Sequence, residues 1–261
     1  MAENRRIRIG VGGWTFPPWR GVFYPDDLTQ KRELEYASRE LTSIEVNGTY
    51  YGTIRRDSFR VWRDQTPDGF VFSLKAPRFA TNRRKLAEAG PSIARFLDSG
   101  VLDLGDKLGP INWQFLPTKA FDPDDFEAFL SLLPKRIDGR PMRHAVEVRH
   151  ASFASPTFVS LLRRYGIAIA TDADSKFPVI PDVTADFVYA RIMGTTPSRR
   201  AGYTPRALDL WAKRARQWSA GEPPVKKSAR DVFLYVIAGY KPHNPAAAMQ
   251  LIRRIGQQET A

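Results

Sequence analysis

Several short segments of this chain alternate apolar and polar residues, and the polar phase ends in a charged or amide side chain. In the segment 43–47, Ile44 and Val46 share one face, whereas Ser43, Glu45 and Asn47 share the other. The same alternation recurs in five further segments, whose polar phases end at Lys75, Gln114, Arg149, Asp172 and Arg191. This pattern is typical of a closed parallel barrel, which turns apolar faces toward outer helices and carries its chemistry at the carboxyl ends of its strands.

The order of the segments predicts one α/β domain. Strands are expected near residues 7–12, 43–47, 70–75, 111–115, 144–148, 167–171, 187–191 and 232–236. Helical patterns separate most of them, as in βα units that build a parallel sheet. Four helix starts carry a capping residue followed by proline, namely Asp122-Pro123, Ser155-Pro156, Thr204-Pro205 and Asn244-Pro245.

The stretch 173–186 is the exception to this order. It contains Pro178 and Pro181 and has no helical stripe, so we expect a degenerate crossover between the sixth and seventh strands. With eight strands and 261 residues, the chain has the length of one complete barrel. We therefore predict a single TIM-type (β/α)8 barrel over residues 1–261.

The composition excludes cysteine chemistry but does not identify a binding partner. The formal net charge is +12 and the sequence pI is about 10.1, which attracts nucleic acid, anionic lipid and phosphorylated metabolites alike. There is no cysteine, so disulfides, thiolate metal sites and a cysteine nucleophile are excluded. The first residues show neither a long apolar stretch nor a signal-peptide pattern. We expect a soluble cytoplasmic protein without a membrane partner.

The sequence does not match three known motifs, namely a dinucleotide-binding loop, a helical zinc site and a serine-nucleophile elbow. Residues 10–13 follow the first strand, but Thr15 replaces the third glycine of a dinucleotide loop. We expect these glycines to let the first strand approach its neighbours. The histidines His144, His150 and His243 lack the spacing of a helical zinc site, and no Gly-x-Ser-x-Gly elbow occurs. The sequence therefore predicts no metal site and no cofactor.

The strongest candidate site is a ring of polar side chains at the carboxyl mouth of the barrel. Its predicted members are Glu45, Asn47, Lys75, Gln114, Glu147, Arg149, Asp172 and Arg191. One interpretation is a structural layer of ion pairs that plugs the barrel. We favour a functional site, because buried charges are costly and are seldom retained for stability alone.

The ring has the residue types for binding and proton transfer. The arginines would hold a carboxylate or phosphate group by bidentate hydrogen bonds. Glu45 and Glu147 are the candidates for general acid or base, with Glu147 and Arg149 at the centre of the site. Trp14, in the first loop, is a candidate wall of the pocket.

These residues fall within motifs that resemble the family called domain of unknown function 72, the YecE-like proteins. The resemblance covers residues 7–255. It is carried by Gly12-Gly13-Trp14, Trp19, Phe23-Tyr24-Pro25, Glu45-Val46-Asn47-Gly48-Thr49-Tyr50-Tyr51, Phe72-Ser73-Leu74-Lys75-Ala76-Pro77, Leu108-Gly109-Pro110, Gln114, Pro117, Glu147-Val148-Arg149-His150, Tyr189-Ala190-Arg191 and Gly194. The resemblance implies a TIM-type barrel with its shared polar residues at one mouth, and it implies no particular reaction.

The chain departs from the family pattern at several positions. Family members typically carry histidine where this chain has Asn82 and Met193, paired asparagines where it has Ile237-Ala238, and an asparagine near Ala247. These departures indicate a divergent branch with another substrate, or one that binds a ligand without turnover.

Three classes of function follow. The leading hypothesis is a small polar, anionic ligand at the mouth, with hydrolase or lyase chemistry by carboxylate acid and base groups. The second is a nucleic-acid-binding or nuclease-like barrel, based on the net charge, on Arg199-Arg200 in an expected mouth loop, and on Tyr203 as an exposed ring that stacks bases. The third is a ligand-binding protein without catalysis.

Overall fold

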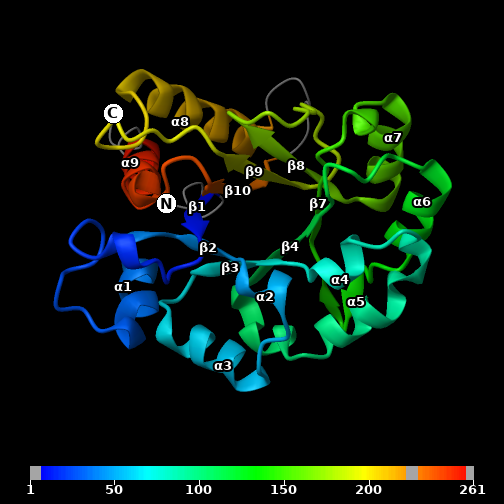
Figure 1. The fold of residues 1–261 in the computed structure, drawn as a ribbon, viewed down its shortest axis with the longest axis horizontal. Helices are drawn as coiled ribbons and strands as arrows, with labels where there is room; N and C mark the ends of the chain where they lie inside the picture. Colours follow the sequence, from blue (N-terminus) through cyan, green and yellow to red (C-terminus); the bar gives the residue numbers. More distant parts are fainter. Residues whose placement is uncertain (1–6, 222–228, 257–261) are drawn as a thin grey trace.

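Eight parallel strands close into one barrel. The structure, a computed structural model, describes residues 7–221 and 229–256. The barrel strands are β1 (Ile7–Gly12), β2 (Ser43–Val46), β3 (Val71–Lys75), β4 (Leu108–Gln114), β7 (His144–Glu147), β8 (Ala168–Ala173), β9 (Phe187–Ile192) and β10 (Asp231–Val236). Their order around the barrel is β1-β10-β9-β8-β7-β4-β3-β2 (Figure 1). Each strand matches one of the eight predicted segments, so the TIM-type barrel is confirmed.

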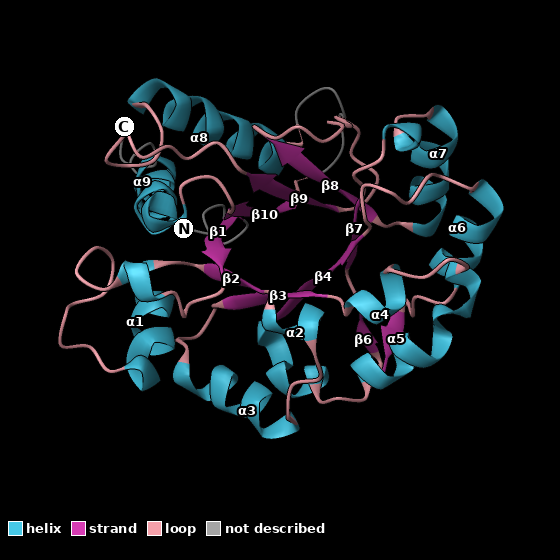
Figure 2. Cartoon of the chain, viewed as in Figure 1, coloured by secondary structure: helices cyan, strands magenta, loops and turns pink. Residues whose placement is uncertain are grey.

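Helices surround the strands on the outside, as Figure 2 shows in cyan around magenta. They are α1 (Glu33–Glu40), α2 (Gly48–Tyr51), α3 (Arg56–Gln65), α4 (Arg78–Thr81), α5 (Gly90–Leu97), α6 (Pro123–Ser131), α7 (Pro156–Tyr165), α8 (Pro205–Ala220) and α9 (Asn244–Gly256). Short 3-10 helices span Pro17–Trp19, Gln30–Arg32, Leu86–Ala89, Val101–Lys107, Ala151–Phe153 and Lys241–His243. A small hairpin, β5 (Arg136–Ile137) with β6 (Arg140–Pro141), precedes β7.

The connection between β8 and β9 contains no helix, as expected for 173–186. The chain crosses there as an extended loop with turns. Among the described residues, no helix is both long and apolar enough to cross a lipid bilayer.

Three of the four predicted helix caps form. The side chains of Asp122, Ser155 and Thr204 accept hydrogen bonds from backbone amides in the first turns of α6, α7 and α8. Asn244 differs, because its side chain is buried and accepts a hydrogen bond from the Thr195 hydroxyl at 2.7 Å. It therefore joins the start of α9 to the loop after β9 instead of capping the helix.

The barrel has an apolar outer layer and a mixed interior. The outer core packs strand residues such as Phe72 and Trp113 against the helices. Inside, the Tyr235 hydroxyl lies 2.7 Å from both Ser43 Oγ and Ser73 Oγ, forming a polar layer above Phe233. These interior positions are the polar phase of the sequence pattern. The barrel is therefore filled by side chains up to the level of its charged mouth.

Glycine in β1 permits a close approach to β2. A Cβ atom on Gly10 would lie only 1.8 Å from the Ser43 carbonyl oxygen. Only glycine fits at this position. The structure thus supports the packing interpretation of the glycines in 10–13.

Candidate functional site

Four buried charged residues meet where the inward phases of the strands end. Glu45 of β2, Glu147 of β7, Asp172 of β8 and Arg191 of β9 are each at most 4% exposed. Strand register contributes directly, because Asp172 lies opposite Arg191 in the β8–β9 pair. We call these four residues, together with Lys75 and Arg149, the mouth cluster. Sequence alternation predicted all six members.

Arg191 is the centre of the mouth cluster. Its Nε and Nη2 atoms donate to the two carboxylate oxygens of Glu45 at 3.1 and 3.2 Å. Its Nη1 atom lies 2.6 Å from Glu147 Oε2 and 3.7 Å from Asp172 Oδ1. Burial lowers the pKa of Arg191, but the carboxylates of Glu147 and Glu45 raise it by a larger amount. The guanidinium therefore remains charged. The Arg191 guanidinium therefore pairs with carboxylates of two strands, β2 and β7, that are distant in sequence.

Glu147 is surrounded by donors. Arg149 donates to its Oε1 at 2.8 Å, Gln114 donates to the same oxygen, and Asn112 donates to Oε2 at 3.0 Å. Burial raises the pKa of Glu147, but the nearby cations, led by Arg191, outweigh it and lower this pKa to about 2. Glu147 is therefore a firmly ionised carboxylate at neutral pH.

Glu45 also has two kinds of partner. Besides its pairing with Arg191, its Oε2 accepts a hydrogen bond from the Tyr189 hydroxyl at 2.6 Å. Both glutamates thus hold positive and neutral donors in position, and neither side chain is exposed to solvent.

Asp172 has a different environment from the glutamates. Neither of its carboxyl oxygens accepts a hydrogen bond from the described residues, although both are buried. Burial and the neighbouring charge of Glu147 raise the pKa of Asp172 well above its ordinary value. Asp172 is therefore the carboxyl of the mouth cluster that most readily carries a proton.

The two remaining cations lie against aromatic rings. Lys75 Nζ is 4.3 Å from the ring centroid of Tyr50, and the Arg149 guanidinium is 4.3 Å from that of Phe177. Burial, followed by the repulsion of Arg191, lowers the pKa of Lys75. Arg149 is 22% exposed, so it links the buried carboxylates to the open mouth.

A small pocket of about 180 Å³ opens above the mouth cluster. Among the described residues, its lining includes three cationic side chains and no carboxylate. The lining residues are Gly12, Asn47, Arg149, Arg191, Met193, Ile237, Ala238, Lys241 and Asn244. We call this the mouth pocket. Its walls include Met193, Ile237 and Ala238, three of the positions at which the resemblance implies a departure from the family pattern.

Ala238 is one of these departures, and its backbone is unusual. It has a φ of 54°, in the left-handed region that asparagine tolerates better than alanine. Its carbonyl accepts a hydrogen bond from Asn244 Nδ2 at 3.1 Å. The pocket therefore has a left-handed turn at this position, where the resemblance implies an asparagine. Of the other two positions, Asn82 follows α4 and Ala247 lies in α9, and neither lines this pocket.

Some predicted site residues lie elsewhere. Trp14 packs edge-on against Trp62 and Phe72, with ring centroids 5.1 and 6.4 Å apart, in the layer between barrel and helices. It is not among the residues that line the mouth pocket. Tyr203, expected as an exposed stacking ring, is 9% exposed, and its hydroxyl donates to Asp174. That expectation was wrong, because the loop after β9 folds the ring against its neighbours.

Other residues of the site were not predicted. Asn112 occupies the inward phase one layer below Gln114, so the alternation was a usable signal. Lys241 begins the short 3-10 helix after β10, with its Nζ 4.1 Å from the Phe16 ring centroid. No local pattern marks this lysine as part of the mouth, since its position depends on contacts between the two ends of the barrel sequence.

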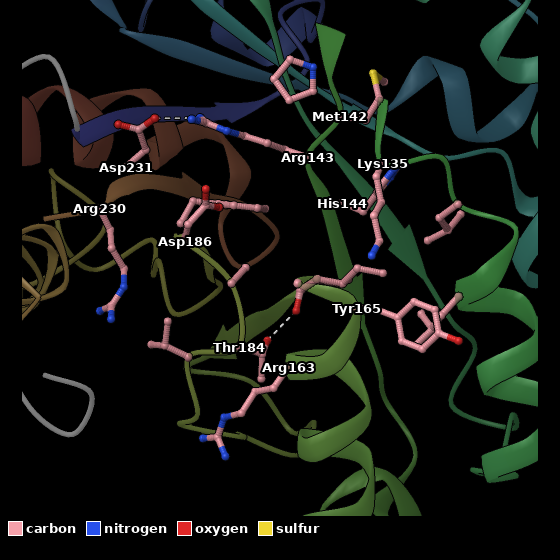
Figure 3. Close-up of a pocket in the computed structure, with 18 of the residues that line it drawn as sticks. Lys135, Met142, Arg143, His144, Arg163, Tyr165, Thr184, Asp186, Arg230 and Asp231 are labelled. Carbon is pink, nitrogen blue, oxygen red and sulfur yellow. Dashed lines mark hydrogen bonds and ion pairs between the residues drawn. The ribbon is translucent and has the colours of Figure 1, made fainter. Parts of the chain in front are cut away.

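A larger cavity of about 1110 Å³ lies at the opposite, amino-terminal end of the strands (Figure 3). Arg143 reaches Asp231 across one edge of this cavity, with Nη1 2.7 Å from Oδ2. His144 lines it but is engaged, because its Nδ1 accepts from Trp113 and its Nε2 lies 2.9 Å from the Pro134 carbonyl oxygen. Burial lowers the pKa of His144 to about 4, so it is neutral.

The described residues contain no group of three histidine, aspartate or glutamate side chains arranged to hold a metal ion. The carboxylates of the mouth cluster are separated by arginines, which compete with a cation for the same oxygens. The donor set that is present suits an anion above the cluster.

The fold and the site together define a TIM-type barrel with a dense charged cluster at its carboxyl mouth. A family model described as "Protein of unknown function DUF72" matches residues 8–261. The chain belongs to this family.

Comparisons with individual proteins agree with this assignment. The UPF0759 protein YecE of Escherichia coli K12 is 29% identical over 150 residues, which cover 56% of this chain and 50% of YecE. The chain thus spans about half the length of this curated relative in the alignment. A DUF72 protein from Thermotoga maritima is similar with a TM-score of 0.72 and 22% identity, over 97% of this chain and 99% of that one.

A second DUF72 protein, from Enterococcus faecalis, gives a TM-score of 0.69 at 14% identity, over 98% of this chain and 96% of that chain. At these identities the two structures support the fold alone.

Proposed function

We propose that the mouth pocket binds a small anionic molecule through a phosphate or carboxylate group. The observation that carries this proposal is the lining itself, in which Arg149, Arg191 and Lys241 supply positive charge and no described residue supplies a carboxylate. Guanidinium groups bind such anions through paired hydrogen bonds. The amides of Asn47 and Asn244 add neutral donors.

The size of the pocket limits the ligand. Its volume of about 180 Å³ is below the roughly 300–1,000 Å³ typical of pockets for drug-sized molecules. A phosphate group or a short organic acid fits this space better than a nucleotide does. A larger substrate would insert only its anionic end.

The carboxylates below the pocket divide into two roles. Glu147, with a pKa near 2, suits the fixed counter-ion of Arg149 and Arg191 better than it suits a general base at neutral pH. Glu45 pairs with Arg191 in the same way. We assign the proton-carrying role to Asp172, whose pKa is raised. Hydrolase or lyase chemistry, if the barrel performs it, then depends on Asp172 more than on the two glutamates.

Lys241 provides the cleanest test of anion binding. Replacing Lys241 with methionine keeps an apolar stem over Phe16 and removes the charge. Calorimetric titration with inorganic phosphate and with malonate should show binding to the native protein that weakens about tenfold in Lys241→Met. The matched control is Lys176→Met, which removes an exposed lysine outside the mouth pocket. Equal affinities in all three proteins would overturn the proposal.

Asp172→Asn tests the catalytic part. It should leave anion affinity within about twofold and abolish any turnover of a ligand found to bind, followed by NMR of the ligand. A variant with full turnover would remove Asp172 from the chemistry. A native protein that binds ligands without converting any would favour the non-catalytic alternative.

Nucleic-acid binding is the second candidate. Arg199 and Arg200 are exposed in the loop after β9, and two exposed aromatic residues, Tyr51 in α2 and Phe79 in α4, follow strands at the same end of the barrel. Such a face suits a single strand that stacks bases and pairs its phosphates with cations. Binding of an oligonucleotide should weaken steeply with salt and further in Arg199→Ala/Arg200→Ala. Salt-independent binding, or no effect of these substitutions, would remove this candidate.

A further inference from the structure

A second pocket of about 780 Å³ lies beside the mouth, between helix α8 and the ends of β8 and β9. It shares no lining residue with the mouth pocket. The two pockets are neighbours along the chain, because Met193 lines the mouth pocket and the next residue, Gly194, lines this one. We call it the side pocket.

Asp174 lies in the side pocket with a strained backbone. Its φ is 55°, in the left-handed region that side chains other than glycine seldom adopt. Gly194 makes room for it, because a Cβ atom there would lie 2.8 Å from the Asp174 Cβ. A non-glycine residue held in this conformation by its neighbours commonly marks a binding or catalytic position.

Two aromatic residues fix the direction of the Asp174 carboxylate. The Tyr203 hydroxyl and the Trp211 Nε1 atom donate to the same oxygen, Oδ2, at 3.1 and 3.2 Å. Tyr203 in turn accepts a hydrogen bond from the Gly194 amide at 2.7 Å. The other oxygen, Oδ1, accepts no hydrogen bond from any described residue, and Asp174 is exposed. Oδ1 is thus available to accept a hydrogen bond from a ligand.

The rest of the lining adds an apolar surface and positive charge. The indole of Trp211 is half-buried, and Leu210 beside it is 60% exposed. Lys213 and Arg214 follow on the same helix, and both line the pocket. An indole face packs against the C–H surface of a ring, a carboxylate oxygen accepts hydroxyl groups, and the two cations attract a negative substituent.

We propose that the side pocket binds an acidic sugar, that is, a pyranose ring carrying a carboxylate or phosphate group. Ring hydroxyls donate to Asp174 Oδ1, the ring lies on Trp211, and the acidic group pairs with Lys213 and Arg214. This site does not depend on anion binding in the mouth pocket, because the two share no residue.

The indole N–H of Trp211 reports on this site directly. In a ¹⁵N-labelled protein, its resonance is assigned with Trp211→Phe and followed during titration with D-glucuronate, D-glucose and benzoate. We expect a saturable shift with D-glucuronate and a weaker response to D-glucose, because glucose lacks the acidic group. Lys213→Met should reduce the preference for glucuronate over glucose. Absence of a shift with both sugars, or a larger shift with benzoate, would overturn the proposal.

Asp174→Asn is the sharpest variant, because asparagine tolerates the left-handed backbone and can still accept the bonds from Tyr203 and Trp211. It replaces the available acceptor oxygen with an N–H donor. We expect glucuronate, followed by the Trp211 indole resonance, to bind about tenfold more weakly to Asp174→Asn and equally well to Lys176→Met, which changes an exposed lysine in neither pocket. Unchanged affinity in Asp174→Asn would contradict the proposed hydroxyl contact, and an equal loss of affinity in Lys176→Met would show that glucuronate responds only to the net charge of the protein.

Discussion

The two ends of this barrel carry charged residues in different ways. At the carboxyl mouth, Arg191, Glu45 and Glu147 are at most 5% exposed and interlock through several contacts. At the amino end, the Arg143 and Asp231 side chains are 40% and 35% exposed and form one ion pair beside a cavity about six times larger than the mouth pocket. Buried charged side chains that contact one another therefore indicate the candidate site better than the volume of a cavity does.

The largest effect should come from removing the central cation of the mouth. Arg191→Met leaves Glu45 and Glu147 buried without their shared partner, which typically costs about 3–5 kcal/mol. Urea denaturation would measure the loss in the free energy of unfolding. If the variant does not fold, Arg191→Met/Glu45→Gln, which removes one of the stranded charges, should recover part of the stability. A loss of stability below about 1 kcal/mol in Arg191→Met would show that the buried charges of the mouth contribute no more than an exposed ion pair does.

Acid should weaken the mouth cluster through Glu147. Its pKa is lowered from 4.5 to about 2 in the folded protein. Its contribution is therefore present above pH 4.5 and is lost as the pH falls toward 2, with a magnitude of about 3 kcal/mol. The difference in stability between the native protein and Glu147→Gln should shrink over this window. Asp106→Asn, which neutralises a carboxylate on a fully exposed side chain, is the control.

Asp172 should respond with the opposite sign. Because its pKa is raised in the folded state, its ionisation opposes folding increasingly as the pH rises above the unfolded value of about 3.9. We expect Asp172→Asn to be more stable than the native protein at pH 8, by about 1–2 kcal/mol, and to lose this advantage near pH 4. Denaturation curves at the two pH values measure it. Destabilisation that is equal at both pH values would show that Asp172 is ionised in the native state.

A smaller effect is expected from Tyr189→Phe. It removes the hydroxyl that donates to Glu45 but leaves the Arg191 pairing intact, so we expect a loss of about 1–2 kcal/mol. The same denaturation experiment measures it. No loss at all would indicate that Arg191 alone satisfies Glu45.

The smallest effect should be at the amino end. Arg143→Met removes a half-exposed ion pair and keeps an apolar stem near Phe187, so the loss should stay within about 1 kcal/mol. A loss as large as that of Arg191→Met would mean that both ends depend equally on buried charge.

The sequence was sufficient for the fold and for the membership of the mouth cluster, because the period-two pattern fixes which side chains enter a closed barrel. The sequence could not show which carboxyl group of the mouth cluster is ionised and which carries a proton. The low pKa of Glu147 and the raised pKa of Asp172 follow from which strands face each other across the barrel, and alternation within a strand does not contain that information. Trp14 lies in a loop and Lys241 in a short 3-10 helix, where position depends on long-range packing instead of periodicity.

The most direct test of the central claim is a crystal of the native protein soaked in selenate, an anion whose position is visible by anomalous scattering. We expect an anomalous peak in the mouth pocket, within hydrogen-bonding distance of Arg149 or Lys241, that is much weaker in Lys241→Met. A mouth pocket without a peak, with selenate bound instead at the amino-terminal cavity beside Arg143, would contradict it.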